Sequence, residues 1–417
     1  MTSENQTQCA FAAVLAVDWA DASHDYALLP EGCGKAEAGK LRQDPGELAV
    51  FVAGLRQRFG GRPVAVVVEQ SRGALVHALL GHDHLVVHPV RPAALASFRK
   101  ALCACGAKDD PTDAALLLEF FLKHPGHVRA WKGDDEATRT LALLVEERRR
   151  AVAERTRLVE QMLAALKQFH PQAIELLGGN VGGALAVRLL ARWPDFQSLR
   201  RAGTGRLRRL LHACRHPRAE DLLRRFGRLC ATPPLTCDAA VCEAGAARVA
   251  RLAAQISVLA PRIAGLDRRI AELFARHPDA PLFAALPGAG KALAPRLLAL
   301  FGSERGRWER AGDVASFTGI APVTRRSGNS WSVGFRLACP KFPRQSLHEF
   351  AAASTRYCPW AGGFYQACRQ RGMRHHQAVR ALAFKWVRII FHCWKTRTPY
   401  EESKCRQAAR WAPAPTA

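Results

Sequence analysis

The sequence predicts an α/β domain at the N-terminus followed by an almost wholly helical chain. Three observations lead to this prediction. Short apolar runs alternate with helical patterns over residues 12–125, a heptad spacing of apolar residues covers 244–275, and basic helical patterns fill most of the chain after 278. With 417 residues, 48% of them apolar, the chain is long enough for two or three folded units.

The N-terminal region alternates between strand and helix patterns. Residues 13–18 form a short apolar run, and residues 24–29 alternate as its hairpin partner would. Residues 63–69 include four valines, a β-branched run typical of a buried strand, and 85–88 predict a further strand. Helical spacing predicts the helices of this domain at 47–59, 73–80, 91–102 and 112–123.

The centre of the chain predicts two long helices. The first covers residues 141–169 and is highly charged. The second covers 244–275, where Pro261 predicts a kink. This second helix can pair inside the chain, against 141–169, or between chains, in which case a dimer or tetramer is expected. Its apolar residues are spaced alternately by three and four, the sequence condition for a coiled coil: Val249, Leu252, Ile256, Leu259, Ile263, Leu266, Ile270 and Leu273.

The charge of the chain indicates a polyanionic partner. Lys and Arg number 61 and Asp and Glu number 36, so the formal net charge is +25. Nucleic acid is the partner that such an excess predicts first. Residues 188–228 contain twelve Arg and three acidic residues. This bias favours a surface that contacts phosphates over a face that is merely solvated.

The remaining composition predicts a reduced, cytoplasmic protein. The first ten residues are polar and do not resemble a signal peptide, and we expect no membrane partner. The thirteen cysteines include no Cys-x-x-Cys pair, although Cys103 and Cys105 are two apart and Cys237 and Cys242 five apart. Buried thiols are therefore expected rather than a zinc site.

Four acidic residues stand where an active site is expected. Asp18 and Glu69 each end a predicted strand, and ligands of open α/β sheets bind at strand ends. Asp110 and Asp113 are three apart at the start of a predicted helix, so both can face one side. Four carboxylates in one place would repel one another unless they held a cation, and oxygen ligands suit Mg²⁺ or Mn²⁺.

Structural explanations for these acids stay open. Each could be a surface residue at a strand end, and Asp110 could cap its helix. Asp109 is an alternative to Asp110. Asp21 and Asp25 are weaker alternatives to Asp18.

Two C-terminal segments have features of nucleic-acid contact. Residues 287–290, Pro-Gly-Ala-Gly, resemble a helix–hairpin–helix turn, in which Gly288, Gly290 and the following Lys291 would approach a phosphate. A plain turn between helices is the alternative. Residues 325–328, Arg-Arg-Ser-Gly, place a serine in a basic segment within a predicted loop at 321–345. This serine could attack phosphorus while Arg325 and Arg326 stabilise the charge.

Together these segments resemble the DEDD transposases of the insertion-sequence-110 type, the RNA-guided bridge recombinases. The similar segments are 14–18 (VLAVD), 67–73 (VVEQSRG), 107–114 (AKDDPTDA), 286–290 (LPGAG), 317–322 (FTGIAP), Ser327-Gly328 and 398–400 (TPY). The ordered combination is more specific than any one segment.

This resemblance implies a function and a domain organisation. Asp18, Glu69, Asp110 and Asp113 would bind Mg²⁺ or Mn²⁺, and Ser327 would form a phosphoserine link to DNA. Donor and target DNA, a structured bridge RNA and a homo-oligomer would be the partners, near the nucleoid of a prokaryotic cytoplasm. The expected segments are an RNase H-like (RuvC-type) domain at 1–130, a helical, coiled-coil and Arg-rich region at 131–277, a mainly α transposase domain at 278–402 and a loosely ordered tail at 403–417.

Some alternatives remain at the level of sequence. Residues 335–344 depart from the family's Gly/Lys/Arg-rich stretch, so Ser330 and Ser332 stay alternatives to Ser327. A metal-dependent, structure-selective nuclease would need the acids but no serine. A non-catalytic nucleic-acid scaffold would need neither.

Overall fold

A computed structural model describes residues 11–69, 73–102, 110–328 and 330–403. The chain divides into two compact units, Met1–Asp134 and Asp135–Ala417. The expected tail at 403–417 lies outside the described residues, apart from Ser403.

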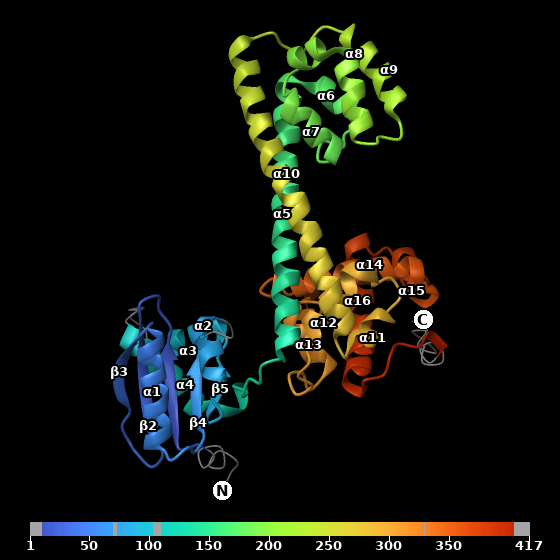
Figure 1. Ribbon diagram of the computed structural model, residues 1–417. Helices are drawn as coiled ribbons and strands as arrows, with labels where there is room; N and C mark the ends of the chain where they lie inside the picture. The colour runs from blue at the N-terminus through green and yellow to red at the C-terminus, as the bar shows by residue number, and fades with distance from the viewer. Residues whose placement is uncertain (1–10, 70–72, 103–109, 329, 404–417) are drawn as a thin grey trace. The chain divides into compact units, whose positions relative to one another are not determined.

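The first unit is built on a mixed five-stranded sheet (Figure 1). The strand order is β3-β2-β1-β4-β5, in which β1, β4 and β5 are parallel while β2 and β3 are antiparallel neighbours. The valines of β4 are at most 2% exposed, as expected for a strand covered on both faces. The strands are β1 Ala13–Asp18, β2 Ser23–Pro30, β3 Glu37–Arg42, β4 Val64–Val68 and β5 Leu85–Pro89.

Helices cover both faces of this sheet. Strand side chains alternate between the faces, so Leu15 and Val17 join one hydrophobic core with α1 (Pro45–Arg58) and α2 (Ala74–Leu80). Ala16 joins the other, with residues of α3 and α4. The other elements of this unit are α3 Pro92–Leu102, α4 Asp110–Lys123 and a short 3-10 helix at Pro125–His127.

The expected strands and helices of this unit are confirmed, but the prediction missed β3. Its sequence, EAGKLR, has no β-branched or aromatic residue. Only Leu41 of this edge strand is buried, so no alternating apolar pattern marks it.

The second unit is organised around two long helices, α5 (Glu136–Phe169) and α10 (Ala239–Arg276), which pack antiparallel (Figure 1). Thr138 at the start of α5 lies 2.8 Å from the His277 ring nitrogen just after α10. At the other end of α5, Phe169 lies against Gly245. Pairing within the chain is therefore the confirmed alternative, and the expected heptad residues are buried or half-buried in this unit's two cores.

α10 is the one described helix whose length and composition would allow a membrane span. Along α10, however, Val249, Leu252 and Ile256 are at most 1% exposed in a core shared with α5. A helix paired in this way needs no membrane to cover its apolar stripe. The helix also continues through Pro261.

A helical subdomain joins one end of the paired helices, and a larger helical domain joins the other (Figure 1). The first, which we call the tip, contains α6 Pro171–Leu176, α7 Ala184–Arg192, α8 Phe196–Ala213 and α9 Ala219–Cys230. The second contains α11 Ala280–Ala284, α12 Gly290–Phe301, α13 Ala311–Phe317, β6 Pro322–Ser327, β7 Ser330–Phe335, α14 Lys341–Tyr357, α15 Pro359–Gln370 and α16 His375–Thr396.

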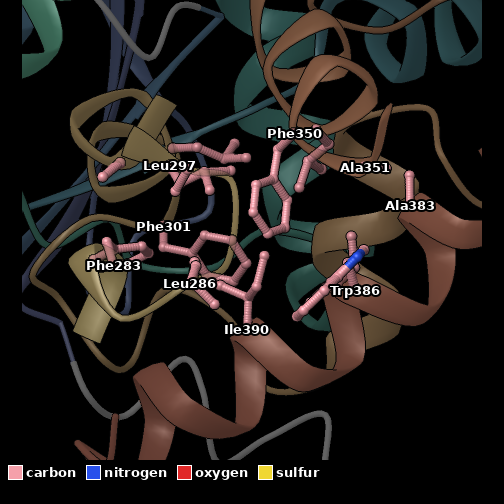
Figure 2. Close-up of a cluster of buried hydrophobic side chains, with 14 of the residues drawn as sticks. Phe283, Leu286, Leu297, Phe301, Phe350, Ala351, Ala383, Trp386 and Ile390 are labelled. Carbon is pink, nitrogen blue, oxygen red and sulfur yellow. The ribbon is translucent and has the colours of Figure 1, made fainter. Parts of the chain in front are cut away.

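Large aromatic side chains fill the core of the C-terminal domain (Figure 2). Phe301 of α12, Phe350 of α14 and Trp386 of α16 are all fully buried. The Trp386 indole donates a hydrogen bond of 2.8 Å to the Ser354 hydroxyl, and the Trp394 indole donates one of 2.7 Å to the Gly302 carbonyl. These donors would be costly to bury without partners.

The prediction of a loop at 321–345 is wrong over most of its length, because these residues contain the β6–β7 hairpin and the start of α14. The described hairpin side chains are mostly exposed; β6 contains Arg and Ser, and β7 contains Ser. A two-stranded ribbon without a buried face gives no alternating hydrophobic signal, so the sequence pattern did not distinguish it from a loop.

We expect Gly245→Ala to destabilise the paired helices, although alanine favours a helix more than glycine does. A Cβ at Gly245 would lie 2.5 Å from the Phe169 ring, and overpacking of this kind costs about 1–3 kcal/mol. Gly227→Ala in α9 is the matched control, because a Cβ there meets nothing within 4 Å and should stabilise by about 0.5–1 kcal/mol. Urea unfolding measures both, and equal stabilisation by the two variants would contradict the packing.

The stability of the first unit should fall as the pH drops from about 6.5 toward 4. His88 of β5 is 6% exposed, and burial lowers its pKa to about 4. An unfolded histidine binds a proton near pH 6.5. Between pH 6.5 and 4 the unfolded chain is therefore protonated while folded His88 is not, and the free energy of unfolding falls by about 3 kcal/mol. Hydrogen exchange of the β4 and β5 amides measures this loss. His88→Leu should reduce it, and an unchanged pH profile in that variant would exclude His88 as its source.

Candidate active site

The fold places Asp18 and Glu69 side by side at one edge of the sheet. Val17 of β1 is in register with Val68, the last residue of β4, so Asp18 and Glu69 each come directly after this pair. Neighbouring strands lie about 4.8 Å apart. Asp18 and Glu69 are both half-buried, which leaves them accessible to a ligand.

The Asp18 side chain, at the end of β1, points toward the face that α4 covers. Ala16 and Val67 belong to the core on that face, and side chains two residues apart on a strand point the same way. Asp18 therefore shares the face with the helix that begins at Asp110, and Glu69 follows β4 at the same end of the sheet.

Asp113 lies in the first turn of α4 and is 4% exposed. It stands on the same helical stripe as Leu117, which is fully buried in the core against the sheet. The Arg99 guanidinium, from α3, forms an ion pair of 2.5 Å with the Asp113 carboxylate. A buried carboxylate without such a partner would be strongly destabilising. Arg99 therefore neutralises the negative charge of Asp113.

The remaining acids are placed only in part. Asp110 is the first residue of α4, but its side chain lies outside the described part of the structure, as does the whole of Asp109. Among the described residues, no group of three or more His, Cys, Asp or Glu could hold a metal ion. The carboxylate oxygens of Asp18, Glu69 and Asp113 fit a divalent cation in their chemistry.

Asp25 lies closer to Asp18 than the sequence indicated. It pairs directly with Asp18 across β1 and β2, so both side chains lie on one face. It is 9% exposed and lies 3.7 Å from the Lys40 ammonium. Asp21, the other alternative to Asp18, is exposed between the two strands. The signal for Asp25 was available only from the hairpin register, and Arg99 had no signal at all.

Ser327 is the last residue of β6 and is exposed. It pairs with Ser330 across the hairpin, and Ser332 follows two residues later, so the three candidate serines share one face. Ser330 and Ser332 are exposed as well. Arg326 is exposed beside Ser327, whereas the side chain of Arg325 lies outside the described part.

Contacts at the base of the hairpin hold it to the C-terminal domain. The Arg380 guanidinium of α16 lies 4.3 Å from the centre of the Phe335 ring. Arg344 of α14 donates a hydrogen bond of 3.3 Å to the Arg336 carbonyl. These contacts lie at the Phe335 end of the hairpin, whereas Ser327 and Ser330 lie at its turn.

The turn at 287–290 joins α11 to α12 as a helix–turn–helix. Gly288 has a φ of +84°, and a Cβ there would lie 3.1 Å from the backbone of Ala353 and Ser354 in α14. Helix packing therefore explains the glycine at 288. Gly290 has a φ of +53° with open space around it, and Lys291 is exposed. Contact with a phosphate stays a prediction for this turn.

Comparison with protein families finds two matches. A transposase model for the DEDD enzymes of IS110 matches residues 15–171, and a model described as the transposase IS116/IS110/IS902 family matches residues 280–366. The first match includes all four candidate acids, and the second includes the turn at 287–290 and Ser327.

Individual relatives resemble the chain over nearly its whole length. A Streptomyces coelicolor protein named as a transposase for the IS117 mini-circle is 25% identical, over 93% of this chain and 95% of its own. The 43.6 kDa protein of insertion element IS110, from the same organism, is 27% identical over 91% of this chain and 93% of its own. The 42 kDa protein of IS900 from Mycobacterium paratuberculosis is 27% identical over 94% of this chain and 98% of its own.

Arg99→Gln should strengthen the binding of Mn²⁺ to the acidic site. The guanidinium competes with a cation for Asp113 and repels it, so its loss should favour the metal by about 1 kcal/mol, or about fivefold in affinity. Calorimetric titration of the full chain measures the change. Arg62→Gln is the matched control, because Arg62 pairs with Glu31 on the surface. An affinity that stays the same or weakens would show that Arg99 does not compete with the metal.

Proposed function

Because the chain belongs to the IS110 family of transposases, we propose that it cuts and rejoins the DNA of its insertion element and of the target through a phosphoserine intermediate. The family implies a requirement for a divalent metal, for which we propose Mg²⁺ or Mn²⁺. The observation that supports the proposal is that Asp18 and Glu69 come directly after the register pair Val17–Val68, in a sheet covered by α4, which carries Asp113. The relatives come from bacteria, and we propose that this protein acts on the bacterial nucleoid.

The first unit is proposed as an RNase H-like domain that positions the scissile phosphate. Its mixed sheet supports this, since two parallel strands end together beside a helix that begins with acids. Asp18, Glu69, Asp110 and Asp113 would hold the metal. A bound divalent cation would supply charge neutralisation at the phosphate oxygens. Asp25 would add negative charge beside Asp18.

Ser327 is proposed as the nucleophile. Its hydroxyl oxygen attacks phosphorus, a P–O bond of the DNA backbone breaks, and the serine proton leaves to solvent or a basic group while the released DNA oxygen takes up a proton. The product is a phosphoserine ester. Attack by a DNA hydroxyl on that ester reverses the chemistry, rejoins a strand and frees the serine. Arg326 beside it is suited to stabilise the charged transition state.

A structured guide RNA is the proposed reader of DNA sequence. The net charge of +25 supports a large polyanionic partner, and a protein that leaves sequence reading to base pairing needs mainly backbone contacts. We also propose a homo-oligomer. The heptad residues of α10 are already used within the chain, so the oligomer would have to form through another surface.

A hydrolytic nuclease is the second candidate. The three serines of the hairpin are equally exposed, and none of the described contacts activates Ser327. In this alternative, water attacks the phosphate at the acidic site and no adduct forms.

A covalent-adduct trap tests the proposal. We expect DNA to stay attached to the denatured wild-type protein, made together with its native flanking DNA, and attachment to disappear in Ser327→Ala. Ser330→Ala and Ser332→Ala are the matched controls, because both serines lie on the same face of the hairpin. Asp18→Asn should abolish both the adduct and cutting.

The other outcomes of this trap separate the alternatives. Metal-dependent cutting without an adduct, unchanged in Ser327→Ala, would replace the recombinase with the hydrolytic nuclease. An adduct that disappears only in Ser330→Ala or Ser332→Ala would move the nucleophile to that residue. Neither cutting nor adduct formation, with nucleic-acid affinity intact, would favour the scaffold.

A further inference from the structure

The tip, from α6 to α9, has a charge distribution that the proposed chemistry does not use. Both family matches leave out residues 172–279, which include nearly all of the tip. Its own hydrophobic core contains Leu189, Leu207 and Phe226, together with residues of α5 and α10. The tip is therefore a folded subdomain rather than a linker, and its surface composition calls for a separate explanation.

The acidic residues of α7 to α9 already have structural roles. Asp195 caps α8 by accepting a hydrogen bond from the Ser198 amide. Glu220 and Asp221 lie in the first turn of α9, where they pair with Arg208 and Arg224. These carboxylates leave most of the arginines of the same segment without an acidic partner.

Nine exposed arginines in this segment have no carboxylate partner among the described residues. We call them the tip arginines. All cations between residues 188 and 228 other than histidine are arginine, and none is lysine. They are Arg188, Arg192, Arg200, Arg201, Arg206, Arg209, Arg215, Arg218 and Arg228.

Helical spacing turns these arginines outward in groups. Arg188 and Arg192 are four apart on α7, and Arg206 and Arg209 are three apart on α8, so each pair shares a helix face. The apolar residues between them point into the core. Arg188 reaches Cys214 at the end of α8, which brings the two helices' basic surfaces together.

Solvation alone does not explain this surface. Like charges at this density repel one another and destabilise the fold unless a counter-charge is bound. A merely soluble surface can use lysine, whereas the arginine guanidinium is suited to bidentate contact with phosphate. The partner that this chemistry fits is a closely spaced row of phosphates.

We propose that the tip arginines bind the sugar–phosphate backbone of a nucleic acid, at a surface separate from the β6–β7 hairpin that carries Ser327. This goes beyond the proposed function, because it assigns a binding surface to a part of the chain that neither family match covers. On α5, the core of the C-terminal domain reaches Val145 and the core of the tip begins at Leu158, so the two cores are separated by 13 helical residues, roughly 20 Å. The backbone can belong to DNA or to RNA, and the experiment distinguishes them.

The test compares two full-length variants from which the same charge is removed. The first carries Arg200→Gln, Arg201→Gln, Arg206→Gln and Arg209→Gln. The control carries Arg42→Gln, Arg56→Gln, Arg58→Gln and Arg62→Gln, because each of these arginines pairs with a carboxylate. Binding to a random-sequence DNA duplex and to an RNA hairpin of equal stem length is measured by fluorescence anisotropy over a range of salt concentrations.

We expect the affinity of the tip variant at low salt to be about tenfold or more below that of the wild type. The slope of log affinity against log salt should also become shallower, by about one for each phosphate that the variant no longer binds. A weaker affinity for only one probe identifies the nucleic acid that the tip binds. An unchanged slope on both probes, or an equal change in the control, would overturn the proposal.

A second variant separates an electrostatic effect from a failure to fold. Lysine at the same four positions keeps the charge, so it should retain most of the salt slope while affinity falls by a smaller factor. If the slope falls as far in the lysine variant as in the glutamine variant, the effect is not electrostatic and the proposal is wrong. These readouts need neither Ser327 nor the acids, so a failure here is distinct from a failure of the phosphoserine mechanism.

Discussion

The antiparallel packing of α5 against α10 is the interaction on which the second unit depends. The two helices contribute Leu141, Val145 and Ile270 to the core of the C-terminal domain, and Leu158 and Val249 to the core of the tip. The apolar interface between α5 and α10 therefore contributes residues to both hydrophobic cores of the second unit. The ion pairs between the helices are largely exposed and add little, so burial of this interface is the main contribution. Most of the stability of a helix in a protein comes from packing of its apolar face, so each of these helices is stabilised by its partner.

A different constraint governs the candidate active site, namely the charge of carboxylates that the fold holds near one another. Parallel pairing of β1 and β4 makes Asp18 and Glu69 neighbours, and the antiparallel pairing of β2 adds Asp25. Lys40 and Arg99 lie against Asp25 and Asp113, so the protein supplies cations of its own where carboxylates are buried. A metal that used Asp113 would take over the role of Arg99, and binding would then combine metal coordination with the release of an ion pair.

The sequence predicted those parts of the molecule that have a buried face. The valines of β4 and the heptad residues of α10 produced clear patterns because their side chains enter cores. β3 and the β6–β7 hairpin were missed because their stability depends on backbone pairing, which leaves no apolar period. The candidate acids were found from their positions at strand and helix ends. Arg99 was not, since an ion pair between α3 and α4 depends on how the two helices pack. Nor did the pattern show that Gly288 is required by its contact with α14.

The candidate acids and the candidate serines belong to different compact units, each with cores of its own. In the proposed mechanism both sets would act at one phosphodiester, and holding reacting groups in the right geometry can supply much of a rate enhancement. No hydrophobic core among the described residues contains both sets. The proposed substrate provides a physical reason for that division, because a nucleic acid bound to basic surfaces on the protein can order separate units by its own stiffness. The net charge of +25 would supply the backbone contacts that hold such a nucleic acid.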